Sequence, residues 1–353
     1  MKILFLGGTG FVGRHMVSAA LNCGHDVTIF TRNKTNSDIF PDVERLVGDR
    51  DGGLDTLIGR RWDAVVDVNG YVPRVVRDSL ELLRGSVGRY LFVSAGNACF
   101  RAESSGEDFI IDENTPRTIS GNPQTEEYWG GDYGALKARC EEAVEEVFPD
   151  NSLIFRLGVV AGPFDPTDRV TYWVDRVARG GEVFVPAKPD SPINFIDARD
   201  LADFTMLALE KSFSGIFNVA GQPLTWMDWL SACRLGSRSE VKFKWSADVQ
   251  MIAGHVDLNS RPFGALPMMP GTTKIIFSSE KAVAAGLKYR EQRETAADIL
   301  SWHRGRSLSK DESSESLIHR SRKALDWAHV GDVRHWMAGL TSEQEMKLLQ
   351  ELD

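Results

Sequence analysis

The sequence predicts an α/β fold with a doubly wound parallel sheet, a smaller C-terminal lobe and a helical tail. Short apolar runs alternate with stretches of helical periodicity through the first 160 residues, and a glycine cluster separates the first run from the first helical stretch. Such alternation is typical of parallel strands that are buried on both faces and joined by helices. The length of 353 residues exceeds that of one ordinary domain.

The N-terminal elements form a βαβ unit. Residues 2–6 read as a strand, and apolar residues then recur at helical spacing from Phe11 to Leu21. A second β-rich run follows at 26–30, so the crossover between the two strands should be right-handed. The same alternation continues with strands predicted at 43–47, 64–68, 90–93 and 153–155, and helices at 75–83 and 133–147.

A glycine motif stands directly after the first strand. Gly7, Gly10 and Gly13 are spaced by three residues and enclose Phe11 and Val12. Glycine lets the chain turn sharply and lets the backbone approach a pyrophosphate, while the helix N-terminus directs N–H groups at the charge. The motif therefore predicts a dinucleotide site in a Rossmann fold, although such turns also occur for packing alone.

The end of the second strand bears on the choice of cofactor. It runs into Thr31, Arg32, Asn33 and Lys34, with no carboxylate among them. Asp or Glu at this point suits the 2′-hydroxyl of NAD, whereas Arg or Lys suits the 2′-phosphate of NADP. NADP is therefore favoured over NAD, and the alternative is that Arg32 and Lys34 are solvated loop charges.

The chain is expected to have three parts. These are a Rossmann lobe at 1–160 with return segments near 193–222, a proline-punctuated substrate lobe at 161–306, and a helical extension at 307–353. In the extension, Ser342 and Glu345 have the spacing of a capping box ahead of a helical pattern. The extension is expected to pack on the protein, or else to form a lid or an oligomer contact.

Composition excludes several classes of function. The net charge of −9 opposes nucleic-acid binding and favours a small-molecule substrate. The opening apolar run stops at Gly7, too short for a membrane span, so no membrane partner and a cytoplasmic location are expected. The seven histidines and the four cysteines show no metal-binding spacing, so reduced thiols and no metal are expected at Cys23, Cys99, Cys140 and Cys233.

Tyr133 and Lys137 are the candidate catalytic pair. They stand four residues apart within a helical pattern, so both side chains lie on one face. A phenol with a pKa of about 10 is a poor base, but a neighbouring ammonium stabilises the phenolate. Tyr133 is therefore expected to exchange a proton with a substrate oxygen while hydride moves to or from a nicotinamide. Taken alone, the pair also fits an ordinary exposed helix.

Together, the glycine motif and the Tyr-x-x-x-Lys pair resemble the extended short-chain dehydrogenase/reductases, the NAD-dependent epimerase/dehydratase family, over about residues 1–306. Further agreement lies at 156–163, 195–202 and 217–221. The resemblance implies that Asp49 lies beside the adenine with Arg50 next to it, that the loop of Asn69 passes under the ribose, and that Lys137 holds the ribose. It also implies a homodimer formed through paired helices.

The chain departs from this family after the fifth strand. The family has a Ser or Thr that hydrogen-bonds the reacting oxygen, whereas either way of matching the segment places Ala95 or Gly96 there. Ser94 or Asn97 is expected to take over, because either side chain can donate a hydrogen bond to an oxyanion. Ser94 is the better candidate because it is adjacent, and its alternative role is to cap the end of the strand.

The substrate side is also unusual, with Leu157 and Ala161 where the family often has Pro and Tyr. Aromatic residues expected near the cleft suit a flat or apolar substrate, although core packing also explains them: Tyr128, Trp129, Tyr172, Trp173, Trp226 and Trp229. A second pyrophosphate, as in sugar nucleotides, would need basic partners, for which the candidates are Arg169, Arg176, Arg179 and Arg261.

Three functions remain open from the sequence. The leading one is an NAD(P)-dependent reductase or dehydrogenase that acts on a carbonyl or alcohol of a small molecule, such as a step of secondary metabolism. The second is an NAD-dependent sugar-nucleotide epimerase or dehydratase, which keeps its cofactor bound. The third is a non-catalytic relative that senses dinucleotides or binds RNA, which the altered segment after Ser94 favours and the intact Tyr133 and Lys137 pair opposes.

Overall fold

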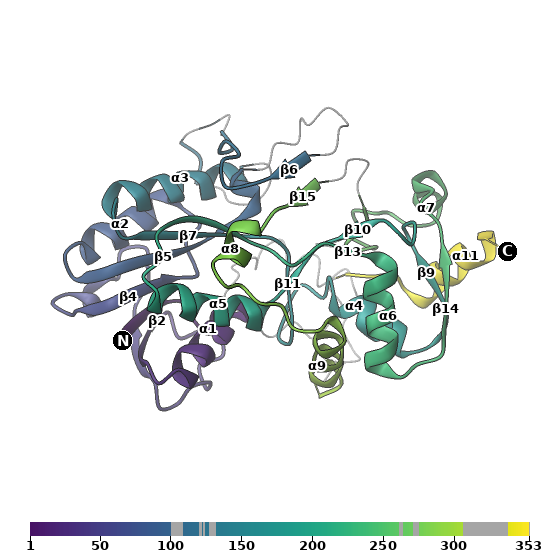
Figure 1. The fold of residues 1–353 in the computed structure, drawn as a ribbon, viewed down its shortest axis with the longest axis horizontal. Coiled ribbons are helices and arrows are strands. Elements are labelled where there is room, and N and C mark those ends of the chain that lie inside the picture. The colour runs from purple at the N-terminus through teal and green to yellow at the C-terminus, as the bar shows by residue number, and fades with distance from the viewer. Residues whose placement is uncertain are drawn as a thin grey trace. The chain divides into compact units, whose positions relative to one another are not determined.

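The structure is a computed structural model that describes residues 1–99, 109–119, 122, 124–126, 132–260, 264–270, 275–305 and 338–352. The chain divides into two compact units (Figure 1), each of which is built from several stretches of the sequence. The first unit contains Met1–Val160, Ala198–Gly221 and Ile275–Lys288, and the second contains Ala161–Asp197, Gln222–Lys274 and Tyr289–Asp353.

The first unit is built on a seven-stranded parallel sheet with the strand order β12-β7-β5-β4-β1-β2-β3. Its strands are β1 (Lys2–Leu6), β2 (Asp26–Thr31), β3 (Glu44–Val47), β4 (Trp62–Asp67), β5 (Val87–Ala95), β7 (Ser152–Leu157) and β12 (Gly215–Val219). The predicted α/β class is confirmed, and the predicted strands fall within a few residues of these bounds. Because the chain reverses its direction of winding between β1 and β4, the crevice at their carboxyl ends is the expected ligand site.

Helices cover both faces of this sheet. Figure 1 shows α2 (Pro73–Leu83) and α3 (Tyr133–Val147) over one face, and α1 (Phe11–Asn22) and α5 (Ala198–Glu210) together on the other. The smaller elements of the unit are η1 (Asp55–Leu57), η2 (Gly96–Ala98), α8 (Glu280–Ala284) and the parallel pair of β6 (Phe109–Ile111) and β15 (Ile275–Phe277). The helix predicted at 133–147 has the bounds expected from its periodicity.

The second unit contains short sheets and helices. Its elements are α4 (Thr171–Ala178), β9 (Gly181–Val185), β10 (Pro192–Ile193), β11 (Ile196–Asp197), β13 (Leu224–Thr225), α6 (Trp226–Ser237), β14 (Val241–Trp245), α7 (Val249–His255), α9 (Gln292–Gly305) and α11 (Ser342–Leu352). The chain passes from the first unit to the second within β8 (Val160–Ala161). No helix in the described part of the chain combines the length and the apolar character needed to cross a membrane.

Three tryptophans lie in the core of the second unit. Trp173, Trp226 and Trp229 are fully buried, and the indole of Trp173 donates a hydrogen bond to the carbonyl of Pro267 at 2.9 Å. The idea that these three side chains form an open aromatic wall is therefore wrong, because packing has removed them from solvent. Tyr128, Trp129 and Arg261 lie outside the described residues.

The helix at the C-terminus corrects two expectations. Its capping box uses Thr341 and Gln344, whose side chains each bond the other's backbone N–H, and not Ser342 and Glu345. The carboxylate of Glu345 is nearly buried and accepts hydrogen bonds from the guanidinium of Arg176 and the backbone N–H of Phe184. The guanidinium of Arg176 thus forms a buried ion pair that holds α11 on the rest of the second unit. This pairing does not fit the expected role of Arg176 as a partner of a substrate pyrophosphate. Residues 306–337 of the predicted extension lie outside the described residues.

A buried cluster of charges joins α3 to the sheet. Glu141 is fully buried and accepts hydrogen bonds from the guanidinium of Arg156 on β7 (Nη2–Oε2 2.9 Å) and from Arg117 (Nε–Oε2 2.9 Å). Its Oε1 also accepts the hydroxyl of Ser94 at 2.6 Å. Burial opposes the charge of Arg156, but the bonds to Glu141 outweigh it and raise the pKa of this guanidinium. A buried carboxylate with this many donors fixes the position of α3 on β5 and β7.

We expect Glu141→Gln to lower the free energy of unfolding by roughly 3–5 kcal/mol, because it leaves the buried guanidinium of Arg156 without its counter-charge. Urea unfolding followed by circular dichroism measures the change. Glu146→Gln is the matched control, since Glu146 pairs with Arg77 on the exposed side of the same helix and the loss of such a surface ion pair should change stability little. Equal losses for the two variants would contradict the structural role of Glu141.

Candidate dinucleotide and catalytic site

The glycine loop between β1 and α1 has the geometry of a cradle. Gly7 and Gly8 have φ angles of +100° and +107°, which L-residues rarely adopt. A Cβ on Gly13 would lie 2.7 Å from the Cα of Gly8, so this glycine permits α1 to pack against the loop. A Cβ on Gly10, by contrast, would meet nothing within 4 Å. Gly10 therefore faces open space at the point where the helix begins.

The N-terminus of α1 is open to an anion. Gly10 is its N-cap residue, no side chain caps it, and no acidic residue stands in its first turn. The first N–H groups of a helix carry a partial positive charge and lack partners within the helix. The backbone from Gly10 through Phe11 and Val12 to Gly13 thus fits a pyrophosphate, which is the group that a dinucleotide would place there.

The loop after β2 lies beside this cradle. The side-chain amide of Asn36 donates a hydrogen bond to the carbonyl of Thr9 at 2.8 Å, which ties the two loops together. Arg32 is half-buried at the start of the β2 loop, and Lys34 is exposed. Arg14, in the first turns of α1, has a pKa lowered by burial and raised in part by the charge of Asp38. Two arginines of the first unit thus stand on the elements that border the cradle.

The predicted adenine and ribose residues differ in their surroundings. Asp49 is exposed, and its carboxylate accepts the backbone N–H of Asp51 at 3.1 Å. Arg50 is buried and forms a two-pronged ion pair with Asp67 at the end of β4. The charge of Asp67 outweighs the effect of burial and raises the pKa of Arg50. The guanidinium of Arg50 is therefore engaged inside the protein, where it supports the loop, and its contact with a cofactor stays a prediction.

Asp67 orients the loop that carries Asn69. Its Oδ1 accepts the backbone N–H of Asn69 at 3.2 Å, and its Oδ2 accepts the hydroxyl of Tyr90 at 2.8 Å. Asp67 is fully buried, and burial together with this carboxylate raises the pKa of Tyr90 well above its ordinary value. No sequence pattern reveals this role of Asp67, because it depends on Arg50 and Tyr90 from distant parts of the chain.

Tyr133 and Lys137 lie at the carboxyl edge of the sheet. The ammonium of Lys137 donates hydrogen bonds of 2.7 Å to two backbone carbonyls. One belongs to Gly70, which follows β4, and the other to Val93, near the end of β5. A Cβ on Gly134 would collide with the carbonyl of Asn97, so the start of α3 packs directly on η2. Because β1, β4 and β5 are parallel neighbours, the candidate catalytic pair and the glycine loop share one edge of the sheet.

Lys137 is a buried cation. Its Nζ lies 4.1 Å from the centre of the Phe92 ring and 5.4 Å from that of Tyr71, and only 3% of the residue is exposed. Burial lowers the pKa of Lys137 from 10.5 to about 8. The ammonium is thus still largely protonated at neutral pH, in surroundings of low dielectric constant where its field on a nearby phenol is strong.

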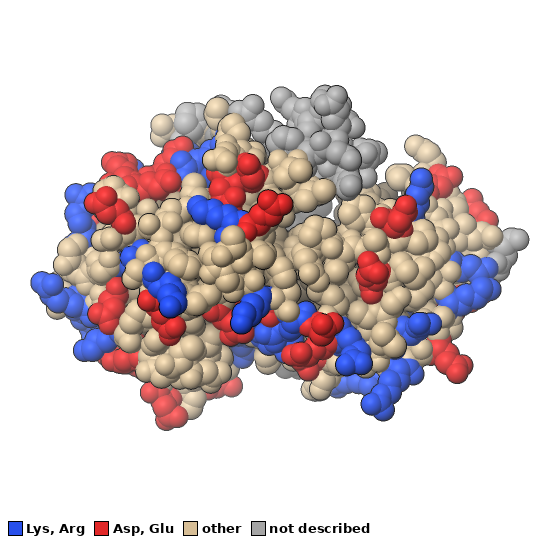
Figure 2. Space-filling model, viewed as in Figure 1, with Lys and Arg blue, Asp and Glu red and all other residues tan. Residues whose placement is uncertain are grey.

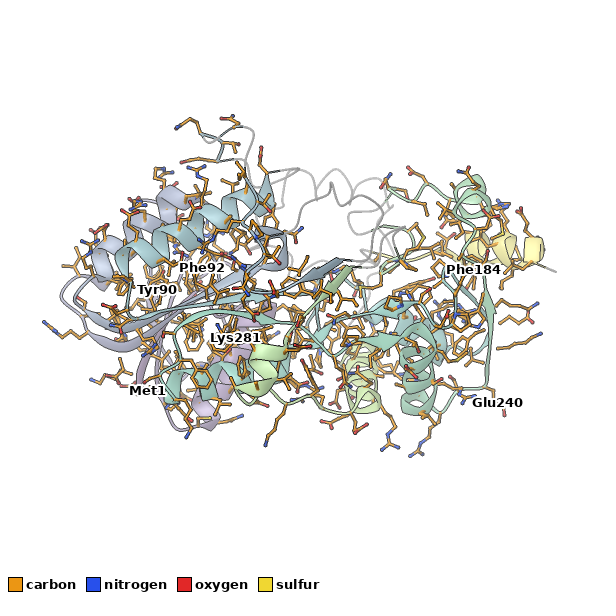
Figure 3. The ribbon with its side chains drawn as sticks, turned by 45° about the horizontal axis from the view of Figure 1, so that its top comes forward. Met1, Tyr90, Phe92, Phe184, Glu240 and Lys281 are labelled. Carbon is orange, nitrogen blue, oxygen red and sulfur yellow. The ribbon has the colours of Figure 1, made fainter. Side chains whose placement is uncertain are left out.

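The hydroxyl of Ser94 has a hydrogen-bond partner inside the protein. Side chains alternate along a strand, so Tyr90, Phe92 and Ser94 share the face of β5 that α3 covers. Tyr90 stacks on Phe148, and the hydroxyl of Ser94 donates to Glu141 (Figure 3 labels Tyr90 and Phe92 on this face). Ser94 is 3% exposed. Its place in catalysis stays a prediction, and the structure gives its hydroxyl a structural partner.

Asn97 has the more suitable position of the two candidates. It is exposed, it lies in η2 directly after β5, and its backbone abuts Gly134, the residue that follows Tyr133. The ring of Phe277 from β15 lies close to Gly96 beside it, at 2.9 Å from where a Cβ on this glycine would be. Packing that no local pattern reveals therefore places Asn97 beside the start of α3 and Phe277 beside Gly96.

Comparisons with known proteins agree with this geometry. A sequence model of the NAD dependent epimerase/dehydratase family matches residues 3–220. The chloroplast stem-loop binding protein of 41 kDa b from Arabidopsis thaliana is 25% identical over 252 residues, which is 66% of this chain. The chain spans 62% of the length of that relative.

Solved structures share the fold. The UDP-N-acetylglucosamine 4-epimerase of Bacillus cereus matches with a TM-score of 0.64 at 18% identity, covering 86% of this chain and 100% of that one. The UDP-glucose 4-epimerase of Thermus thermophilus, solved with NAD, matches with a TM-score of 0.58 at 21% identity, covering 87% and 100%. Identities this low bear on the fold alone.

We expect the two substitutions Gly10→Ala and Gly13→Ala to separate cofactor binding from folding. The methyl of Gly10→Ala enters open space, so the melting temperature should stay near that of the wild type while dinucleotide binding is lost. Gly13→Ala forces the loop apart and should cost about 1–3 kcal/mol of stability as well. Calorimetric melting and dinucleotide titration test both. Undiminished binding by Gly10→Ala would contradict the assignment of the cradle.

The lowered pKa of Lys137 predicts a dependence of stability on pH. Between about 8 and 10.5 the folded protein holds fewer protons at this site than the unfolded chain, so wild-type stability rises with pH in this window. Relative to Lys137→Met, the gain should approach roughly 3 kcal/mol, since each pKa unit is worth about 1.4 kcal/mol. Urea unfolding of both proteins at pH 7 to 10.5 gives this difference.

Lys281→Met is the matched control for that series. The Lys281 ammonium also donates to a backbone carbonyl, that of Ile216, and lies 4.3 Å from the ring centre of Phe217, but its side chain is exposed (Figure 3). Lys281→Met therefore removes similar contacts without removing a buried charge, and its stability is measured across the same pH range. A difference between wild type and Lys137→Met that does not change with pH would refute the cost of burying the charge of Lys137.

Proposed function

Since the chain belongs to the NAD dependent epimerase/dehydratase family, we propose that it is an enzyme that transfers hydride between a nicotinamide dinucleotide and a carbonyl or secondary alcohol of a small molecule. One observation carries the proposal: Tyr133 stands one helical turn from the buried ammonium of Lys137, at the same sheet edge as the glycine cradle. The bound dinucleotide supplies or accepts the hydride, and the chain's own residues handle the proton.

Tyr133 is the proposed acid and base. In the direction of reduction its hydroxyl gives a proton to the carbonyl oxygen, and in the direction of oxidation its phenolate takes one from the alcohol. The charge of Lys137 stabilises the phenolate and so lowers the barrier to either transfer. Among the described residues, the ammonium donates to the carbonyls of Gly70 and Val93. Its third N–H would hold a ribose hydroxyl of a bound dinucleotide.

Asn97 is the proposed donor to the reacting oxygen. Ser94 occupies the neighbouring position in the sequence, but its hydroxyl is bound to Glu141 within the packed face of β5. Asn97 is exposed at the end of β5 beside the start of α3, and its amide provides two N–H groups. A donor of this kind is worth roughly a hundredfold to a thousandfold in rate.

NADP is the proposed cofactor. No carboxylate ends β2 to repel a 2′-phosphate, and Arg32 and Arg14 stand on the two elements that border the cradle. A guanidinium binds a phosphate through two parallel hydrogen bonds, which favours this assignment. Several structural relatives hold NAD, including the Thermus enzyme, so retention of NAD is the alternative outcome and would favour epimerase or dehydratase chemistry.

RNA binding is the second candidate, and it rests on the name of the Arabidopsis relative. Lys and Arg side chains are interspersed with Asp and Glu across the face drawn in Figure 2, where no broad basic surface is visible. The net charge of −9 also opposes attraction to a polyanion. The distribution of charge therefore favours the enzymatic proposal over RNA binding. RNA binding is measured alongside dinucleotide binding.

The test begins with purified, tag-free protein. Denaturation releases any bound nucleotide for identification, and fluorescence titration then gives the affinities for NADPH and NADH. We expect little retained nucleotide and at least tenfold tighter binding of NADPH, since an Arg–phosphate pair is worth about 1.5–3 kcal/mol. Arg32→Asp should reverse the preference. Lys34→Asp, an exposed cation on the same loop, should change it little.

Turnover completes the test. A panel of ketones, aldehydes and nucleotide sugars is incubated with the protein and cofactor, and Tyr133→Phe should lower any observed rate by about 10²–10⁴ while leaving cofactor affinity intact. Retained NAD with conversion of a nucleotide sugar would replace the reductase by an epimerase or dehydratase. Failure to bind either dinucleotide, with tight binding of a structured RNA, would overturn the enzymatic proposal.

A further inference from the structure

Three side chains of metal-binding type gather at the far end of α1 from the glycine cradle. Cys23 and His25 stand in the turn between α1 and β2, and Glu210 is the last residue of α5. Their Sγ, imidazole nitrogen and carboxylate oxygen all lie within 4.8 Å of one another. No other group of three or more such side chains meets this condition in the described part of the chain.

Backbone hydrogen bonds set the positions of Cys23 and His25. Gly24 has a φ of +74°, and its backbone N–H donates a hydrogen bond to the carbonyl of Leu21. The backbone N–H of His25 donates to the carbonyl of Ala20. This is a Schellman motif, which closes a helix and satisfies its last carbonyls. The two ligand side chains are thus held on either side of a fixed turn, and little conformational freedom is lost when they bind the same ion.

Packing between helices supplies the third group. α1 and α5 lie against each other on one face of the sheet, so the end of α5 brings Glu210 to the turn after α1 (Figure 1). The Oε1 of Glu210 lies 3.2 Å from the Nε2 of His25. Asp203, two turns earlier on α5, adds negative charge. Burial is the largest cause of the raised pKa of Cys23, and the charges of Glu210 and Asp203 raise it further.

His25 provides a second, independent observation. Its side chain is 9% exposed, yet its Nε2 has no hydrogen-bond partner, because the approach to Glu210 lacks the geometry of a hydrogen bond. The other ring nitrogen, Nδ1, lies 3.4 Å from the amino group of Met1, the residue labelled in Figure 3. The buried Nε2 thus lies at ion-pair distance from the carboxylate of Glu210 but makes no hydrogen bond, and a metal ion between the two groups would complete this arrangement.

We propose that Cys23, His25 and Glu210 bind a divalent ion of the zinc class. Thiolate, imidazole and carboxylate together suit Zn²⁺ and Co²⁺ better than Mg²⁺ or Ca²⁺, which prefer oxygen ligands alone. With Zn–N of about 2.0 Å and Zn–S of about 2.3 Å, ligand atoms in a tetrahedral site lie roughly 3.5 Å apart, which small side-chain rotations here provide. Because Cys23 is exposed, water takes the fourth position.

The ion acts as a clamp and takes no part in hydride transfer. The 12 residues of α1 separate the site from the glycine loop by about 18 Å. Binding joins the ends of α1 and α5, so it stabilises the folded state in proportion to ion concentration. The thiol proton leaves to solvent as the thiolate binds, and the carboxylates of Glu210 and Asp203, which oppose the bare thiolate, attract the cation.

The test uses the full, tag-free chain after treatment with a chelator, and the probes are ZnCl₂ and CoCl₂ alone. We expect one Zn²⁺ per chain with a dissociation constant below about 10 μM, a rise in melting temperature, and a Co²⁺ spectrum with a near-ultraviolet thiolate-to-metal band. Cys23→Ser should abolish that band. His25→Ala and Glu210→Gln should each weaken Zn²⁺ binding at least tenfold.

His255→Ala is the matched control. His255 pairs with Glu351 on the surface of the second unit with no cysteine in the group, so its removal should leave the stoichiometry and the Co²⁺ band unchanged. Wild-type protein that binds no Zn²⁺ at 100 μM overturns the proposal. So does binding whose affinity and Co²⁺ band survive Cys23→Ser. Dinucleotide binding is measured in parallel, and its presence or absence bears only on the enzymatic proposal.

Discussion

The candidate catalytic site depends on one constraint, the position at which α3 packs on the central sheet. The buried face of this helix carries two charged residues, Lys137 and Glu141. A buried charge without hydrogen-bonding partners destabilises the fold, so each needs partners from neighbouring segments. Glu141 takes Arg156 and Arg117, and Lys137 takes the carbonyls of Gly70 and Val93. These bonds allow one position of the helix, and that position sets Tyr133 at the sheet edge.

The need to pair buried charges also explains how the loop after β4, beside the proposed cofactor site, is held in place. Arg50 and Asp67 are both internal, and their ion pair together with Tyr90 holds the end of β4 where Asn69 begins its loop. The glycine cradle needs no such support, because its shape comes from the positive φ of Gly7 and Gly8 and from the contact of Gly13 with Gly8. Polar networks and glycine geometry thus converge on one edge of the sheet.

The two ends of α1 have opposite chemistry, and helix physics accounts for the difference. Its N-terminus presents unpaired N–H groups next to Gly10, which suits an anion. Its C-terminus is closed by Gly24 in a Schellman motif, and a cysteine and a histidine meet the carboxylate of Glu210 there, which suits a cation. One helix therefore separates the proposed redox chemistry from the proposed metal clamp.

The sequence by itself determined the parallel sheet, the helix at 133–147, the glycine loop and the Tyr133–Lys137 pair, because each depends on spacing within one or two neighbouring elements. The tertiary structure decided which way side chains face and which distant residues meet. It turned Ser94 toward Glu141, engaged Arg50 with Asp67 and buried Trp173, Trp226 and Trp229. It also joined Cys23 and His25 to Glu210. Such contacts arise from packing between elements far apart in the chain, which no local pattern encodes.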